Sequence, residues 1–327
     1  MADHPASSPI LEVSGLHKRF PLDQKLIGAP KHFIYAVNGV SLQLRPGRTV
    51  GLVGESGCGK STVGKLICGL ETPDVGQIRF RGEEVSRYSS AEKMAYHRRV
   101  QIIFQNPYTS LNPRQRAGRM LGEIFRVHRL CAPAEIEKRV SDILEAVGLP
   151  PESRQRYPFE FSGGQRQRLC IARALTVQPE AIVCDEPVSA LDVSIQAQIL
   201  RLLKKLQKEY NLAYLFISHD LSVVYHVCDE VLIMYLGRIV EHGPVERIFK
   251  NPAHPYTKAL LSAVPIPDPQ SGRKRIILSG EIPSPTRIPP GCPFFSRCSQ
   301  RMEVCENSPP PMRQVGPGQE THCWLYE

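Results

Sequence analysis

The sequence predicts an α/β fold, and three observations support this prediction. The apolar segment 50–53 leads into the glycine-rich segment 54–62, after which apolar residues recur at helical spacing. Two further apolar segments, 181–184 and 215–217, each end in polar residues, and residues 195–206 between them have the apolar spacing of a helix. Alternating strands and helices are typical of α/β proteins, which bind ligands where their strands end.

Residues 54–62 have the spacing G-x-x-x-x-G-K-S of a phosphate-binding loop between a strand and a helix. Glycines let successive backbone N–H groups point at one anion, and the following helix N-terminus adds a partial positive charge. Lys60 is expected to reach the β- and γ-phosphates, and the Ser61 hydroxyl to bind Mg²⁺. The sequence therefore predicts that the chain binds a nucleoside triphosphate. The expected contacts in the loop are Gly54, Ser56, Gly57, Cys58, Gly59, Lys60, Ser61 and Thr62.

The composition is that of a globular protein: 42% of the 327 residues are hydrophobic, 22% are charged, and the net charge is +9. This length predicts one large domain with a smaller one, or two domains. The N-terminus lacks the basic and apolar regions of a signal peptide, and no apolar run approaches the ~20 residues that span a bilayer. The basic residues are dispersed and not interleaved with base-stacking aromatics, so charge alone does not favour nucleic acid.

Apolar patterns typical of strands occur on both sides of the loop, in segments 10–20, 33–45, 76–80 and 101–105. Tyr35 has two interpretations, an aromatic ring that stacks on adenine or a half-buried strand residue. Segments 116–130 and 135–148 have helical spacing and predict a small helical insert between strands.

The segment Phe161-Ser162-Gly163-Gly164-Gln165 is expected to begin a second helix suited to phosphate binding. Ser162 is the expected N-cap residue, and the two glycines leave backbone N–H groups accessible. One nucleotide does not need both of these helix starts.

Candidate catalytic side chains follow the later strands. The strand that begins at residue 181 runs into Asp185 and Glu186, which we expect to bind Mg²⁺ and to activate water, respectively; a solvated loop is the alternative. Asp192 follows shortly afterwards, before the next helix. The strand that begins at residue 215 ends at His219, whose position favours contact with the γ-phosphate over a structural role.

Taken in order, these motifs resemble those of the ATP-binding subunits of ABC transporters. The matches are the Walker A loop at 54–62, the Q-loop Gln105, the signature segment 161–165, the Walker B pair Asp185 and Glu186, the D-loop Asp192 and the switch histidine His219. Phe161 departs from the usual leucine. The resemblance implies a P-loop NTPase fold with a mixed sheet core and a helical subdomain at about 106–175.

The resemblance also implies ATP and Mg²⁺ as cofactors, with Tyr35 stacking on adenine. Glu186, His219, Lys60 and Gln105 would be catalytic, and Ser61, Gln105 and Asp185 would bind the metal. Walker A would hold ATP in its own chain, while Ser162, Gly163, Gly164 and Gln165 would cover ATP held by a partner. Closure of two such chains around ATP would then move the coupled membrane subunits.

The C-terminal segment narrows the resemblance to the dipeptide/oligopeptide permease ATPases, and within them to the F-type subunit. The motif Asn-Pro-Ala-His-Pro-Tyr-Thr at 251–257, a proline-rich connector at 265–290 and the terminal cysteines carry this likeness. We therefore expect an ATP-binding domain at 1–250 and an extension at 251–327. The implied location is peripheral, at the cytoplasmic face of the inner membrane.

The implied function is that of the ATP-hydrolysing energy subunit of a peptide importer. Its implied partners are a related D-type ATPase, two transmembrane permease subunits and an extracytoplasmic peptide-binding protein, with no nucleic acid. The alternatives are the same role in an importer of nickel or another small solute, or a soluble ABC ATPase that acts on nucleic acid.

Four of the ten cysteines, Cys292, Cys298, Cys305 and Cys323, lie close to the C-terminus. The other six are scattered and are expected to be small buried residues of a reduced protein. A Cys₄ zinc site is the commonest structural answer and is favoured by chemistry alone, although zinc ligands usually form closer C-x₂₋₄-C pairs. Four thiolates also suit an iron–sulfur cluster, whose ligand spacings vary, and a metal-free tail stays open. The resemblance implies a small metal-binding extension in which all four thiolates hold a [4Fe–4S] cluster, with Zn²⁺ as the alternative.

Overall fold

Residues 8–22, 32–264 and 276–327 are described by the computed structural model, and they group into two units. The first unit contains the residues up to Leu11, Leu44–Arg48 and Phe80–Phe216. The second contains Glu12–Gln43, Thr49–Arg79 and Ile217–Glu327. Each unit therefore combines segments that are far apart in the sequence.

The second unit contains strands of two sheets, ordered β2-β1-β4 and β11-β12-β10-β9-β3. Strand β3 pairs with β9 in parallel, whereas β10 pairs antiparallel with both β9 and β12, so the larger sheet is mixed, as predicted. The strands are β1 (Leu11–Pro21), β2 (Phe33–Leu44), β3 (Thr49–Val53), β4 (Val75–Phe80), β9 (Glu230–Tyr235), β10 (Arg238–Pro244), β11 (Met312–Gly316) and β12 (Gln319–His322). The helices are α1 (Lys60–Ile67), α8 (Leu221–Val227), α9 (Val245–Lys250), α10 (Pro255–Ser262) and α11 (Val304–Asn307).

The first unit contains strands in the order β8-β7-β6 and a group of helices. The strands are β5 (Glu83–Glu84), β6 (Val100–Ile103), β7 (Ala181–Asp185) and β8 (Ala213–Ser218). The helices are α2 (Ser90–Arg99), α3 (Pro107–Ser110), α4 (Ala117–Val127), α5 (Ile136–Ala146), α6 (Gly163–Leu175) and α7 (Val193–Tyr210). Strand β6 pairs with β7 in parallel, and every residue of β7 is buried, as the apolar run at 181–184 predicts for all but the terminal Asp185.

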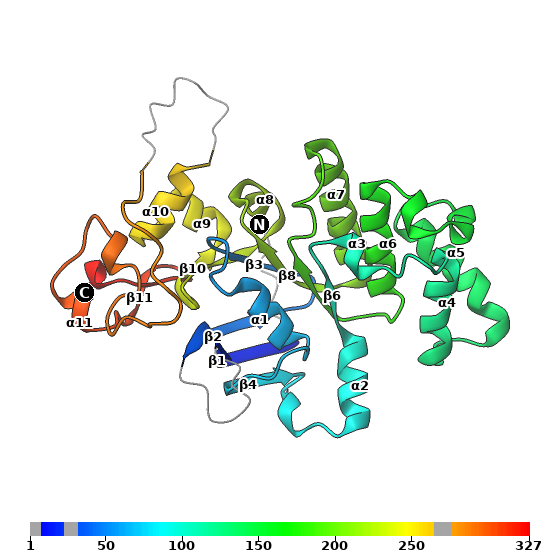
Figure 1. The fold of residues 1–327 in the computed structure, drawn as a ribbon, viewed down its shortest axis with the longest axis horizontal. Helices are drawn as coiled ribbons and strands as arrows, with labels where there is room; N and C mark the ends of the chain where they lie inside the picture. The colour runs from blue at the N-terminus through cyan, green and yellow to red at the C-terminus, as the bar shows by residue number, and fades with distance from the viewer. Residues whose placement is uncertain (1–7, 23–31, 265–275) are drawn as a thin grey trace. The chain divides into compact units, whose positions relative to one another are not determined.

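Helices α4, α5 and α6 pack against one another at the predicted helical insert (Figure 1). Each helix has a fully buried leucine, Leu121 in α4, Leu144 in α5 and Leu169 in α6. Burial of one such side chain contributes about 1.5–3 kcal/mol. Apolar spacing along each helix therefore accounts for this packing.

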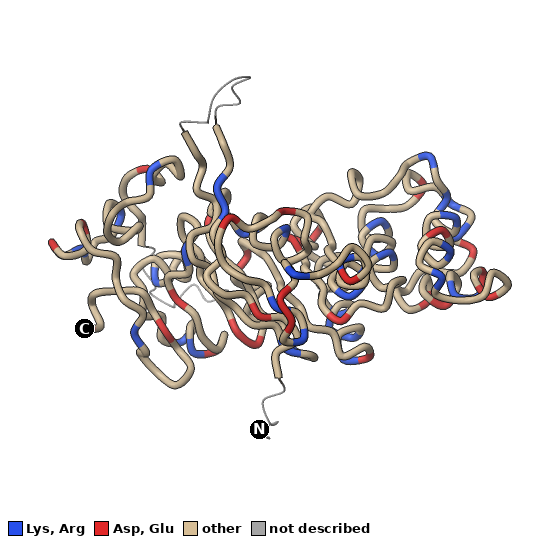
Figure 2. The backbone as a smooth tube through the Cα atoms, turned by 90° about the horizontal axis from the view of Figure 1, so that it is seen from below, with Lys and Arg blue, Asp and Glu red and all other residues tan. Residues whose placement is uncertain are grey.

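Basic and acidic residues are interspersed along the backbone (Figure 2), which agrees with the dispersed charge of the sequence. None of the helices in the ranges that the structure describes is long and apolar enough to cross a membrane.

Two regions differ from the sequence-based expectations. Helix α2 was not predicted, although Ser89 and Glu92 form the capping box that could have revealed it. Strands β11 and β12 lie in a stretch that showed no pattern, because their stability comes from antiparallel pairing with each other and with β10. Of the predicted connector, residues 265–275 lie outside the described residues, and residues 276–290 form neither helix nor strand.

Candidate nucleotide site

The phosphate loop connects buried strand β3 to helix α1 in the second unit. Gly59, the N-cap residue of α1, has φ 106°, and a Cβ atom there would collide with the carbonyl oxygen of Ala36. Only glycine fits this left-handed position without strain. The loop conformation therefore depends on the glycine that the motif predicts.

Lys60 lies at the first position of α1, and its side chain folds back over the loop. Its Nζ donates to the carbonyl oxygens of Gly54 and Glu55, each at 2.9 Å. The neighbouring Cys58 thiol is buried, and burial raises its pKa. Ser56 and Ser61 are exposed on the loop and at the helix start. The loop thus holds its lysine against its own backbone.

The second unit also contains Tyr35 and His219. Tyr35 is half-buried at the start of β2, and its N–H donates to the carbonyl oxygen of Pro285 at 2.9 Å. His219 is exposed directly after β8. The next residue, Asp220, caps α8 by accepting from the N–H of Ser222 at 2.8 Å, which fixes the turn that carries the histidine.

In the first unit, Asp185 is the last residue of β7 and Glu186 follows it, so both lie at the strand end, as predicted. Asp185 is buried, and Glu186 is half-buried with φ 47°, a left-handed conformation that costs a non-glycine residue about 1–3 kcal/mol. Gln105 Nε2 donates to Glu186 Oε2 at 2.8 Å and approaches Ser189 Oγ at 3.5 Å. The structure therefore brings two predicted site residues together and adds Ser189, which was not predicted.

The signature segment begins helix α6, and Ser162 is its N-cap residue, as predicted. The N–H of Gln165 donates to Ser162 Oγ at 3.3 Å, and the Ser162 N–H donates to Gln165 Oε1 at 3.1 Å. A Cβ atom on Gly164 would lie 2.6 Å from Ile195 Cγ2, so helix α7 requires a glycine there. Ser162 itself is exposed and able to face another molecule.

Phe161 departs from the leucine of the signature motif, and the structure explains how it is accommodated. Its ring is buried beneath the guanidinium group of Arg156, whose Cζ lies 4.5 Å from the ring centroid. Phe161 therefore packs against Arg156 directly before the N-cap residue Ser162. Asp192, the predicted D-loop residue, is exposed at the N-cap position of α7.

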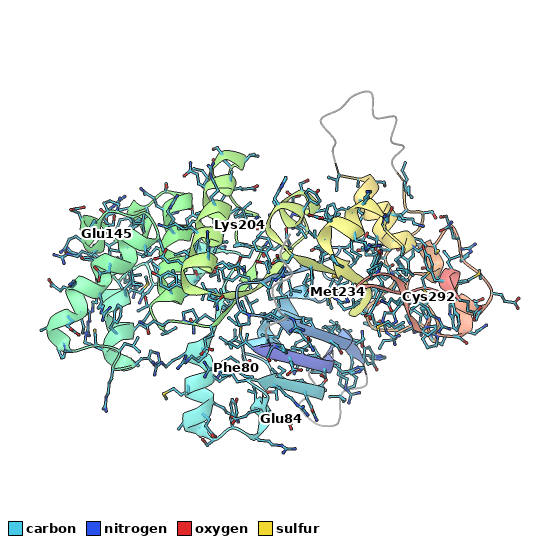
Figure 3. All side chains as sticks on the ribbon, turned by 180° about the vertical axis from the view of Figure 1, so that it is seen from behind. Phe80, Glu84, Glu145, Lys204, Met234 and Cys292 are labelled. Atoms are coloured by element: carbon cyan, nitrogen blue, oxygen red, sulfur yellow. The ribbon has the colours of Figure 1, made fainter. Side chains whose placement is uncertain are left out.

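The four C-terminal cysteines belong to the second unit, and Cys292 lies among its packed side chains (Figure 3). The pKa of the Cys292 thiol is raised to about 11, chiefly by burial and also by the charges of the three other cysteines. Nevertheless, no three His, Cys, Asp or Glu residues in the described part of the chain are grouped so that they could hold a metal ion. The structure gives the predicted metal centre no support.

Comparisons with known proteins identify two parts of the chain. Residues 37–189 match the family model described as ABC transporter, and residues 240–305 match the oligopeptide/dipeptide transporter, C-terminal region. The second match includes the motif at 251–257 and three of the four C-terminal cysteines.

Similar proteins match over nearly the whole length. The putative oligopeptide transport ATP-binding protein YkfD of Bacillus subtilis is 49% identical and covers 97% of this chain and 96% of its own. The dipeptide transport ATP-binding protein DppF of Escherichia coli is 46% identical, with coverages of 98% and 95%. Among solved structures, a dimeric post-hydrolysis state of the ATP-binding cassette MJ0796 with ADP and Pi matches at TM-score 0.63 and 26% identity, covering 72% of this chain and 98% of that one.

Proposed function

Because this chain belongs to the ATP-binding subunits of oligopeptide and dipeptide ABC transporters, we propose that it hydrolyses ATP at sites shared with a partner subunit. The chain is the ATP-hydrolysing subunit of a peptide importer. We also propose the role of each site residue, the pairing with a second ATPase and the cofactor of the C-terminal segment.

The hydrogen bond from Gln105 to Glu186 is the observation that carries the assignment of Glu186 as general base. It orients the carboxylate, and a general base must be held in position to accept a proton. The oxygen donors Ser61, Gln105 and Asp185 suit Mg²⁺, which prefers oxygen ligands. Lys60 and the loop N–H groups would bind the phosphates, His219 would contact the γ-phosphate, and Tyr35 would stack on adenine.

Two features support a site shared between chains. The chain has two helix starts suited to phosphate, at Lys60 and at Gly163, and the second is headed by the exposed Ser162. In addition, the similar cassette MJ0796 forms a dimer with ADP and Pi. We propose a related D-type ATPase as the partner, docked with this chain on two transmembrane permeases at the cytoplasmic face of the membrane and supplied by a peptide-binding protein.

The isolated chain is therefore expected to be a poor ATPase, because its phosphate loop would supply only half of each site. Turnover per molecule should rise with protein concentration and rise further when the partner subunit is added. This is tested by measuring steady-state ATP hydrolysis across a dilution series and determining the molecular mass of the protein in solution at each concentration. High activity that stays constant on dilution of a demonstrably monomeric sample would contradict the shared site.

For the C-terminal segment we propose a [4Fe–4S] cluster held by Cys292, Cys298, Cys305 and Cys323. The gathering of four cysteines near the C-terminus supports this proposal, since cysteine thiolates suit iron–sulfur clusters. When bound, the group would cross-link a segment with little regular structure.

Anaerobically purified protein is expected to be brown and to contain iron and acid-labile sulfide in equal amounts, as measured by elemental and sulfide analysis. Replacement of all four cysteines by serine should remove both, whereas Cys131→Ser should not. Colourless protein that contains one zinc ion would contradict the [4Fe–4S] cluster and support the Zn²⁺ alternative. Metal-free protein would contradict both.

A further inference from the structure

The C-terminal extension holds the phosphate loop at Glu55. Arg297 forms a two-point ion pair with its carboxylate, Nη1 to Oε2 at 2.8 Å and Nη2 to Oε1 at 3.1 Å. Arg297 is 8% exposed, and Glu55 raises the pKa of its guanidinium through this hydrogen bonding. A buried two-point pair of this kind is geometrically specific.

A second contact reaches the same residue from helix α10. The N–H of Glu55 donates to the hydroxyl oxygen of Tyr256 at 3.0 Å. The Tyr256 ring packs against Tyr235, with centroids 4.8 Å apart, and against Phe294 at 5.4 Å. Glu55, which lies between the expected phosphate contacts Gly54 and Ser56, is thus fixed at both its backbone and its side chain.

Tyr256 is itself held by buried polar groups of the motif at 251–257. Glu241, which is fully buried, accepts from the N–H groups of Ala253 and His254 at 2.7 and 2.9 Å. His254 Nδ1 then accepts from the Tyr256 N–H at 3.1 Å, and burial lowers the pKa of His254 to about 3, so it stays a neutral acceptor. The motif therefore has a specific task, which is to set the position of Tyr256.

Arg297 is fixed by the turn that begins at Cys292. The N–H of Arg297 donates to the Phe294 carbonyl at 3.0 Å, and that of Cys292 to the Cys305 carbonyl at 2.7 Å. A further contact from the same extension, Pro285 to the backbone of Tyr35, reaches the residue proposed to stack on adenine. Three separate points of the extension thus touch the nucleotide-binding elements.

We propose that Tyr256 and Arg297, here termed the tail clamp, are positioning residues that hold the phosphate loop through Glu55 and thereby set its affinity for Mg-ATP. Two physical effects lead to this. The Glu55 carbonyl also accepts from Lys60, so release of Glu55 would move the carbonyl that orients the lysine. In addition, Glu55 places a negative charge in a loop that receives an anionic triphosphate, and Arg297 neutralises it. The inference rests on the proposed role of the phosphate loop.

The test measures binding of Mg-ATP to the full-length chain by calorimetry, together with KM and kcat of the assembled transporter. Arg297→Met is expected to weaken ATP binding about tenfold and to raise KM with little change in kcat, a coupling of ordinary size between sites. Arg297→Lys should retain part of the affinity for Mg-ATP that Arg297→Met loses. The double variant Glu55→Gln, Arg297→Met should recover the share of that loss caused by the unneutralised charge of Glu55. Arg287→Met, an exposed arginine of the same extension, is the matched control.

Unchanged affinity in a folded Arg297→Met protein would overturn the proposal, and so would a lower melting temperature without weaker binding. If that variant does not fold, Tyr256→Phe decides, because it removes only the hydroxyl oxygen that accepts from Glu55. Wild-type affinity in Tyr256→Phe would then overturn the proposal. Lys60→Ala in the same assay distinguishes failure of the proposed loop function from failure of the tail clamp. If Lys60→Ala still binds ATP, the proposed role of the phosphate loop fails. If Lys60→Ala loses ATP binding while the tail clamp variants bind ATP normally, only the tail clamp fails.

Discussion

Glu186→Gln is expected to preserve ATP binding and to lower hydrolysis at this chain's site by about 10²–10⁴-fold, the typical value of a positioned general base. The amide oxygen can still accept from Gln105, so the hydrogen bond that orients the side chain is kept while the proton acceptor is lost. The assembled complex should therefore accumulate in its closed, ATP-bound form. Steady-state hydrolysis and retention of labelled ATP measure the two consequences separately.

Glu209→Gln provides the matched control, because it makes the same chemical change at an exposed position near the end of α7. Near-normal hydrolysis by the assembled Glu186→Gln complex would remove Glu186 from the role of base. Loss of ATP binding would instead point to a structural role for its left-handed backbone.

Ser162→Arg is expected to leave ATP binding to this chain intact and to reduce hydrolysis at the partner's site by about 10²-fold or more, the scale of losing transition-state contacts. Ser162 is exposed at the start of α6, so a large cation there obstructs whatever approaches this helix end. Hydrolysis at the partner's site can be followed alone in a complex in which this chain also carries Lys60→Ala, so that its own phosphate loop is disabled.

Substitution of Ser162 also removes a helix cap worth about 1 kcal/mol, and this effect needs its own control. Ser162→Thr retains the hydroxyl that accepts from the Gln165 N–H and should hydrolyse ATP almost normally. Full activity of Ser162→Arg at the partner's site would refute the role of the signature segment across the interface.

Several features could be predicted because short-range chemistry specifies them. The glycine pattern before Lys60, the cap at Ser162 and the polar residues after β7 are each defined by a few consecutive residues. The apolar spacing of α4 and α5 likewise predicts the helical insert. Such signals are local, so the sequence shows them without knowledge of the rest of the chain.

The sequence by itself thus determined the family, the α/β class and the residues proposed to bind and hydrolyse ATP. Only the tertiary structure decided the contacts that join distant segments: Gln105 with Glu186, strand β12 with β10, and Arg297 with Glu55. The last pair joins residues 242 positions apart, and no local pattern marks either residue as the other's partner. The physical reason is that hydrogen bonds and ion pairs of this kind depend on where chain folding places two side chains, not on their neighbours in sequence.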